Sequence, residues 1–160
     1  MNHEPALVIQ RVFAFPRELV FDAWTSVDLL PQWFAPSGCT LHVERLDVRP
    51  GGGFHMCVRS PAFDCWTVGT YLDVTPPERI VFTSTIADAA GNPASPASQG
   101  HDPAWPAETL VTVTFVDRGE QTLVTLEQSV SETLARRTGA YPSWIDMLDR
   151  LERQLTSTRR

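Results

Sequence analysis

Residues 139–155 read GAYPSWIDMLDRLERQL, and this stretch decides the fold. Its large apolar side chains recur three or four positions apart, at Tyr141, Trp144, Leu148, Leu151 and Leu155. That spacing predicts an amphipathic helix with one face against a core. Pro142 is compatible with the first turn, where its missing N–H has no intrahelical partner. We therefore expect a long terminal helix that starts near Ala140 and needs a large apolar surface to lie on.

Length and charge narrow the class of protein. The chain has 160 residues, which predicts a single domain over residues 1–160. Its net charge of −6 makes it a poor partner for phosphate backbones, so no nucleic-acid partner is expected. No apolar run approaches the roughly 20 residues of a membrane span, and the first residues do not form a signal peptide. The odd number of cysteines, Cys39, Cys57 and Cys65, indicates free thiols in a cytoplasmic protein.

Before the terminal helix, the spacing of apolar residues changes near residue 40, where a strand-like alternation begins. Residues 6–14 predict a strand, followed by short helices over residues 17–26 and 28–34, the latter with Asp28 as its N-cap. From residue 40 apolar and polar residues alternate, as in half-buried antiparallel strands. Six further strands are predicted, beginning at Leu41 and Phe54 and then covering residues 64–74, 79–86, 109–116 and 122–128.

Two smaller features of this region give local predictions. Gly69, inside the strand at residues 64–74, predicts a bulge or bend. Ser129 and Glu132 have the spacing of a capping box, which predicts a short helix before Gly139. The full order of elements is typical of an α+β helix-grip fold, in which a curved seven-stranded antiparallel sheet wraps around the C-terminal helix.

A long segment interrupts the strands. Residues 88–108 read DAAGNPASPASQGHDPAWPAE, which is rich in Pro, Ala, Gly and Ser and has no apolar period. Such a stretch inside a compact domain is usually a functional lid or a disordered loop. Trp105 is its only large apolar residue and is therefore the lid candidate.

Several stretches resemble, in the same order and spacing, the family of activator-of-heat-shock-protein-90-ATPase homologues in the START/polyketide-cyclase (SRPBCC) superfamily. They are WFAP at 33–36, LDVRPGGGF at 46–54, GTY at 69–71, PPERIVF at 76–82, and Trp144 with LDRL at 148–151. The resemblance covers nearly the whole chain. It implies an internal apolar cavity, and the family name implies a chaperone partner and a part in the stress response. Two features depart from the family: Pro142-Ser143 precede Trp144 where a Gly is usual, and the 88–108 loop is long.

The search for catalytic and metal-binding residues is mostly negative. The sequence has no nucleophile elbow, Walker loop or dinucleotide fingerprint. The glycine run at 51–53 leads into a strand and reads as a turn, and Asp47 with Arg49 suits a structural ion pair. His3, His42, His55 and His101 lack the spacing of metal ligands, and His42 with His55 is expected on the surface. We expect no catalytic residue, no metal and no cofactor.

The aromatic content leaves two accounts of the interior open. Aromatic residues exceed what a small sheet needs, which indicates either a filled core or a gap between sheet and helix. The candidates for the cavity wall are Trp33, Phe54, Met56, Trp66, Phe82, Val113, Phe115, Tyr141, Trp144 and Leu148.

Three functions remain open, in this order. The first is non-enzymatic binding of a hydrophobic small molecule. The second is a co-chaperone-like interaction module. The third is an enzyme of the cyclase or hydrolase type on an aromatic or polyketide-like substrate, with a polar group from Thr67, Tyr71, Thr125 or Gln128. A homodimer is also left open.

Overall fold

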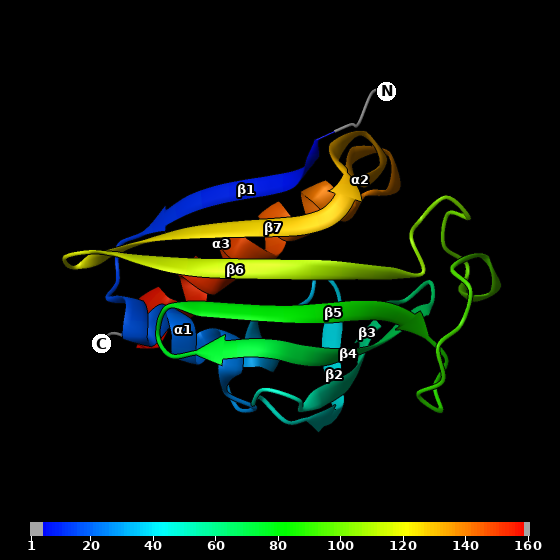
Figure 1. Ribbon diagram of the computed structural model, residues 1–160, viewed down its shortest axis with the longest axis horizontal. Helices are drawn as coiled ribbons and strands as arrows, with labels where there is room; N and C mark the ends of the chain where they lie inside the picture. Colours follow the sequence, from blue (N-terminus) through cyan, green and yellow to red (C-terminus); the bar gives the residue numbers. More distant parts are fainter. Residues whose placement is uncertain (1–4, 159–160) are drawn as a thin grey trace.

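The computed structural model describes residues 5–158. Seven strands form one sheet in the order β1-β7-β6-β5-β4-β3-β2, and every neighbouring pair is antiparallel (Figure 1). The strands are β1 (Ala6–Phe13), β2 (Thr40–Leu46), β3 (Gly53–Arg59), β4 (Asp64–Thr75), β5 (Arg79–Ala87), β6 (Glu108–Arg118) and β7 (Gln121–Ser131). The helices are α1 (Arg17–Thr25), α2 (Glu132–Thr138) and α3 (Ala140–Thr158), with short 3-10 turns η1 (Leu30–Gln32) and η2 (Ala97–Gln99). This confirms the predicted α+β class.

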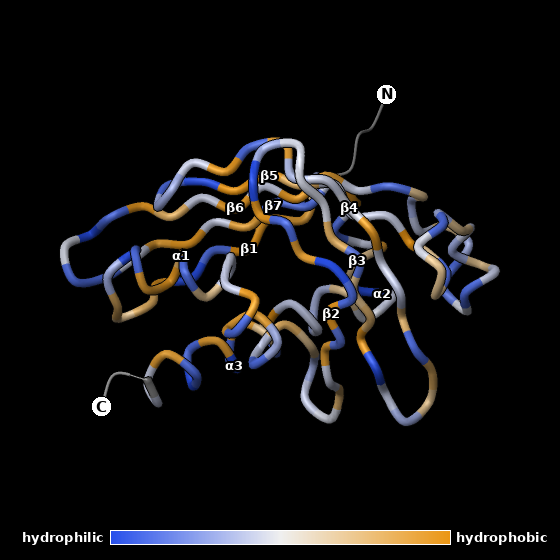
Figure 2. The backbone as a smooth tube through the Cα atoms, turned by 90° about the horizontal axis from the view of Figure 1, so that it is seen from below, coloured by the Kyte–Doolittle hydropathy of each residue, from blue (hydrophilic) through white to orange (hydrophobic). Residues whose placement is uncertain are grey.

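The sheet curves over α3, as predicted for a helix-grip fold (Figure 2). Leu148, Leu151 and Leu155 of α3 are buried, and Trp144 is only 7% exposed. The inward residues of the sheet alternate along each strand, as the two-residue period of a strand requires. On β6 these are Val111, Val113 and Phe115, all buried against the helices.

Polar side chains of α3 fix the helix to the chain on either side of it. Asp149 pairs with Arg11 of β1. Asp146 accepts hydrogen bonds from the backbone N–H and the hydroxyl of Ser37, at 2.7 and 2.8 Å, and these bonds lower the pKa of its carboxyl. Arg150 donates to the carbonyl of Ala35. Residues 35–37, which overlap the stretch that resembles the family at 33–36, therefore hold the helix on one side.

The predicted helix over residues 28–34 is wrong. The structure has only the 3-10 turn η1 there, and its N-cap is Leu29 instead of Asp28. A turn closes between the Ser26 carbonyl and the Leu30 N–H at 2.9 Å, and Pro31 has no N–H with which to continue it. The Asp28 backbone N–H bonds to the Ser26 hydroxyl instead.

Two local predictions also need correction. The capping residue of α2 is Ser131, whose hydroxyl accepts from the Leu134 N–H, whereas the Ser129 hydroxyl accepts from Leu110 across the β6–β7 pair. Strand β7 runs on to Ser131 because that residue still pairs with β1. The bulge of β4 lies between Tyr71 and Asp73, not at Gly69.

Gly69 has a different structural role from the one predicted. A Cβ atom at this position would lie 2.0 Å from the Thr83 carbonyl oxygen and 2.3 Å from the Phe54 ring. The glycine therefore allows the Phe54 ring to lie close to the backbone of β4.

The 88–108 loop has more local order than its composition suggested. The Asp88 carboxylate accepts the backbone N–H groups of Ala90 and Asn92, and Pro93 bridges to Ala87. Trp105 is half-buried and packs against the core. Within residues 5–158, no helix has the length and apolar character needed to cross a membrane.

Candidate functional site

A cavity lies between the concave face of the sheet and the helices. Its volume is about 470 Å3, which is within the range of small-molecule sites, about 300–1,000 Å3. The cavity lies beside the first half of α3 and the 88–108 loop, both of which contribute to its lining. Leu151 and Leu155 fill the other end of the interface, where both are at most 3% exposed.

Most of the cavity wall is aromatic or aliphatic. Trp24 of α1 and Trp144 of α3 stack with their ring centroids 6.2 Å apart, and Phe34 meets Trp144 edge-on at 5.8 Å. Phe54 of β3 and Phe82 of β5 pack against each other on the sheet side, at 5.8 Å. Other apolar wall residues are Leu30, Met56, Val58, Tyr71, Ile80, Ile86, Val111 and Met147.

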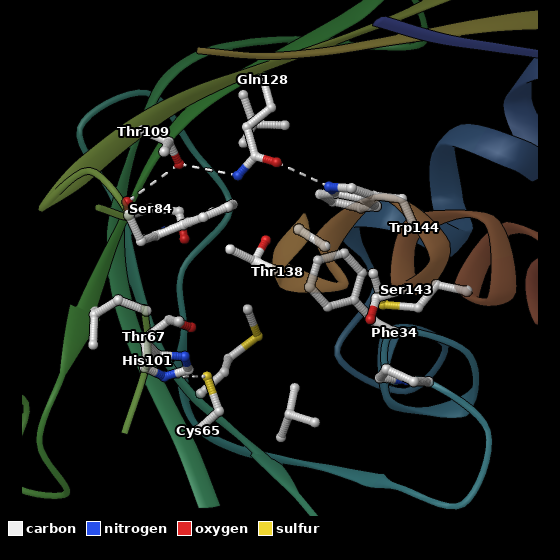
Figure 3. Close-up of a pocket in the computed structure, with 18 of the residues that line it drawn as sticks. Phe34, Cys65, Thr67, Ser84, His101, Thr109, Gln128, Thr138, Ser143 and Trp144 are labelled. Atoms are coloured by element: carbon white, nitrogen blue, oxygen red, sulfur yellow. Dashed lines mark hydrogen bonds between the residues drawn. The ribbon is translucent and has the colours of Figure 1, made fainter. Parts of the chain in front are cut away.

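A directed chain of hydrogen bonds interrupts this apolar wall (Figure 3). The Trp144 indole N–H donates to Gln128 Oε1 at 3.0 Å, and Gln128 Nε2 donates to Thr109 Oγ1 at 3.1 Å. The Thr109 hydroxyl in turn donates to the Ser84 carbonyl at 3.4 Å. All four residues line the cavity, and Gln128 and Thr109 are only 6% and 2% exposed.

A thiol and an imidazole meet at another part of the wall (Figure 3). Cys65 Sγ of β4 lies 3.4 Å from His101 Nε2 of the long loop. Burial raises the pKa of the Cys65 thiol to about 11 and lowers the pKa of His101 below its ordinary value. Both groups are therefore uncharged at neutral pH. A reactive cysteine needs the opposite environment, one that favours its thiolate.

The long loop closes one side of the cavity. Gly100, His101, Asp102 and Trp105 all line it. Asp102 accepts from the Ala104 backbone N–H at 2.8 Å and pairs with Arg137 of α2 at 3.2 Å, and both contacts lower the pKa of its carboxyl. This ion pair joins the loop to the helical side of the cavity.

The structure places several of the predicted residues in the cavity wall. Phe54, Met56, Phe82 and Trp144 line it, and so does the lid candidate Trp105. Of the polar candidates, Thr67, Tyr71 and Gln128 line it as well. Thr125 does not, because its hydroxyl accepts from the Gln10 amide on the outer face of the sheet.

Five other candidates pack elsewhere in the core and are not part of the wall. They are Trp33, Val113, Phe115, Tyr141 and Leu148. Trp33 is fully buried and donates its indole N–H to the Ala23 carbonyl at 2.9 Å. Phe115 packs against Phe21 of α1, with ring centroids 5.3 Å apart. Tyr141 lies under the Arg136 guanidinium, 4.0 Å from the ring centroid.

Trp66 was predicted to line the cavity and instead lies on the outer face of the sheet. It faces His55 and His42 there, with ring centroids 4.8 and 6.0 Å away. The register explains this placement: Thr67 pairs with the inward-facing Met56, so its neighbour Trp66 points the other way.

The sequence analysis missed part of the wall. Trp24 and Phe34 come from the segment before β2, and Met147 lies on α3 one position before Leu148. Ser84 and Ile86 follow Phe82 at alternate positions of β5, so the period of the strand was a usable signal for them. No sequence pattern placed His101 beside Cys65.

The remaining candidate groups are structural. Asp47 and Arg49 form the predicted ion pair at 2.9 Å. His42 bonds Glu44 at 2.8 Å, while His3 lies outside the described residues. Across residues 5–158 no cluster of three His, Cys, Asp or Glu side chains has a metal-binding arrangement. The three cysteines are all free thiols.

Comparison with known proteins gives both a family and a fold. The family model described as Activator of Hsp90 ATPase homolog 1-like protein matches residues 14–156. No curated protein gives a significant match.

Several solved structures are similar in fold. A Staphylococcus epidermidis protein superimposes with a TM-score of 0.80 at 23% identity, covering 99% of this chain and 93% of that one. A Nitrosomonas europaea protein gives 0.78 at 23% identity, with 99% of each chain covered. A Chromobacterium violaceum protein gives 0.76 at 24% identity, covering 94% of this chain and 96% of that one.

Proposed function

The chain belongs to the family of Activator of Hsp90 ATPase homolog 1-like proteins, and from this premise we propose that it binds a hydrophobic small molecule without transforming it. The site is the cavity between the sheet and α3. The observation that carries the proposal is the cavity itself, with about 470 Å3 lined largely by aromatic and aliphatic side chains. Burying an apolar ligand there removes apolar surface from water, at roughly 25 cal/mol per Å2.

Binding without chemistry agrees with the state of the polar groups in the wall. The Cys65 thiol has a pKa of about 11 and is protonated at neutral pH, so it is a weak nucleophile. Burial also raises the pKa of the Tyr71 phenol above its ordinary value. Gln128 has no titratable group and cannot act as a general acid or base. The free thiols support the cytoplasm as the location of the protein.

The test is native mass spectrometry of the protein purified from its own cells. We expect a fraction with an added mass that disappears after denaturation. Thr67→Phe fills the cavity from β4 and should abolish the added mass. Thr70→Phe, on the exposed outer face of the same strand, should keep it. If both variants keep the added mass, the molecule is bound elsewhere and the proposed site is wrong.

A co-chaperone-like role is the second candidate, because a specific surface feature favours it. Val12, Leu123 and Val116 are neighbours across β1, β7 and β6 on the outer face of the sheet. Val12 and Val116 are 42% and 46% exposed, which gives an apolar row accessible to a partner protein. In this case Val116→Asp should weaken binding to an Hsp90-type ATPase, whereas Thr67→Phe should not.

A further inference from the structure

We propose that the ligand is uncharged and carries a hydroxyl or carbonyl group on one edge, which hydrogen-bonds to Gln128. This inference rests on the proposed binding function and specifies the chemical class of the ligand. It follows from three features of the cavity: a buried amide with a fixed orientation, unused hydrogen-bonding capacity on that amide, and the lack of an unpaired charge among the described wall residues.

The orientation of the Gln128 amide is determined by its neighbours. An indole N–H can only donate, so the amide oxygen must face Trp144, at 3.0 Å. The amide nitrogen then faces Thr109 and donates to its hydroxyl, at 3.1 Å. Figure 3 shows the side chain held between these two partners at the cavity wall. An amide fixed at both ends presents a constant pattern of donor and acceptor to a ligand.

The Gln128 amide can form further hydrogen bonds besides those to Trp144 and Thr109. A glutamine amide has two N–H donors and two acceptor lone pairs, and the bonds to Trp144 and Thr109 use one of each. The remaining donor and lone pair suit a hydroxyl, which can both donate and accept, or a carbonyl, which accepts. Because Gln128 is only 6% exposed, a ligand group placed there exchanges hydrogen bonds away from bulk water.

The ionisable groups in the wall disfavour a charged ligand. No Arg, Lys or Glu side chain is among the described residues that line the cavity. The Asp102 carboxylate is already paired with Arg137, and burial keeps His101 neutral at pH 7. An anion or a cation would thus lose its hydration without gaining a partner of opposite charge, which is costly.

The experiment compares three probes of one bicyclic shape: naphthalene, 2-naphthol and 2-naphthoate. Equilibrium dialysis at pH 7 gives a dissociation constant for each. In a purely apolar pocket the added hydroxyl weakens binding, because its hydrogen bonds to water are lost. With Gln128 available we expect 2-naphthol to bind about threefold to tenfold more tightly than naphthalene. We expect the 2-naphthoate anion to bind at least about tenfold more weakly than naphthalene.

The variants assign this preference to the amide. Gln128→Met keeps the length of the side chain and should abolish the preference for 2-naphthol over naphthalene. If circular dichroism shows that this variant does not fold, Gln128→Leu replaces it, because it also removes the amide that bonds Trp144 and Thr109. Thr125→Val, on the outer face of the same strand as Gln128, is the control and should keep the preference.

The outcomes separate this inference from the proposed function. Naphthalene binding with no preference for 2-naphthol overturns the inference and leaves the apolar site intact. A preference that survives in a folded variant without the Gln128 amide shows that another group holds the hydroxyl, and it also overturns the inference. If none of the probes binds, the inference and the proposed function both fail.

Discussion

Replacement of Trp144 by alanine tests how firmly the sheet holds α3. The indole stacks on Trp24 at 6.2 Å, meets Phe34 at 5.8 Å and is 7% exposed. Truncation of a large buried aromatic residue costs about 3–5 kcal/mol. It also leaves the buried Gln128 oxygen without its donor, which adds about 1–3 kcal/mol. One side of the ring already borders the cavity, so fewer packing contacts are lost than in a filled core. We therefore expect a loss of about 4 kcal/mol.

Urea denaturation measures this loss. With an m-value of about 2 kcal/mol/M, the midpoint should fall by about 2 M at unchanged slope. Trp144→Phe keeps one aromatic ring but removes the N–H donor and part of the indole, so it should cost less, about 1–3 kcal/mol. A loss below about 1 kcal/mol for the alanine variant would show that the helix is not held through this residue. Equal losses for both variants would show that packing of the ring is not the source of the stability.

Other predictions concern the thiol, the loop and one glycine. Burial raises the pKa of the Cys65 thiol to about 11 in the folded protein, against an ordinary 9.0. The protonated thiol therefore contributes its full stabilisation of the fold below pH 9 and loses it as the pH rises towards 11. Stability should then fall by up to about 2 kcal/mol as the pH rises from 9 to 11, and Cys65→Ala should lessen this fall in urea titrations. Deletion of residues 91–101 should leave the melting temperature nearly unchanged, since loop closure costs grow slowly with length. It should also speed release of naphthalene several-fold, and an unchanged off-rate would show that the loop is not a lid. Gly69→Ala should cost about 3 kcal/mol, because the new methyl meets the Thr83 carbonyl and the Phe54 ring; a neutral effect would contradict that packing.

The elements that follow a strong apolar period were predictable from the sequence. The apolar stripe of Trp144, Leu148, Leu151 and Leu155 can be buried only as one face of a helix. In the same way, the alternation of apolar and polar residues along β3 predicted that Phe54 and Met56 face inward. The prediction failed at residues 28–34, where Pro31 restricts the chain to a 3-10 turn despite the apolar spacing of Leu29, Leu30, Trp33 and Phe34.

The site was less predictable than the fold, because it depends on which strands pair and in what register. Both faces of β4 carry large residues, so alternation alone did not decide between Trp66 and Thr67. The pairing of Met56 with Thr67 determines that Thr67 faces the cavity, and this register is set by the tertiary structure. The Trp144–Gln128 bond and the Cys65–His101 contact also join segments far apart in the sequence, and no local pattern predicts them.

The most direct test of the account locates a bound apolar molecule in solution by NMR. Naphthalene at saturation should give intermolecular NOEs to the side chains of Met56, Ile86 and Met147, which line the cavity from β3, β5 and α3. The exposed methyl groups of Val8, on the outer face of the sheet, should give none. NOEs only to outer-face residues, or no binding at saturating naphthalene, would contradict a hydrophobic ligand site between sheet and helix.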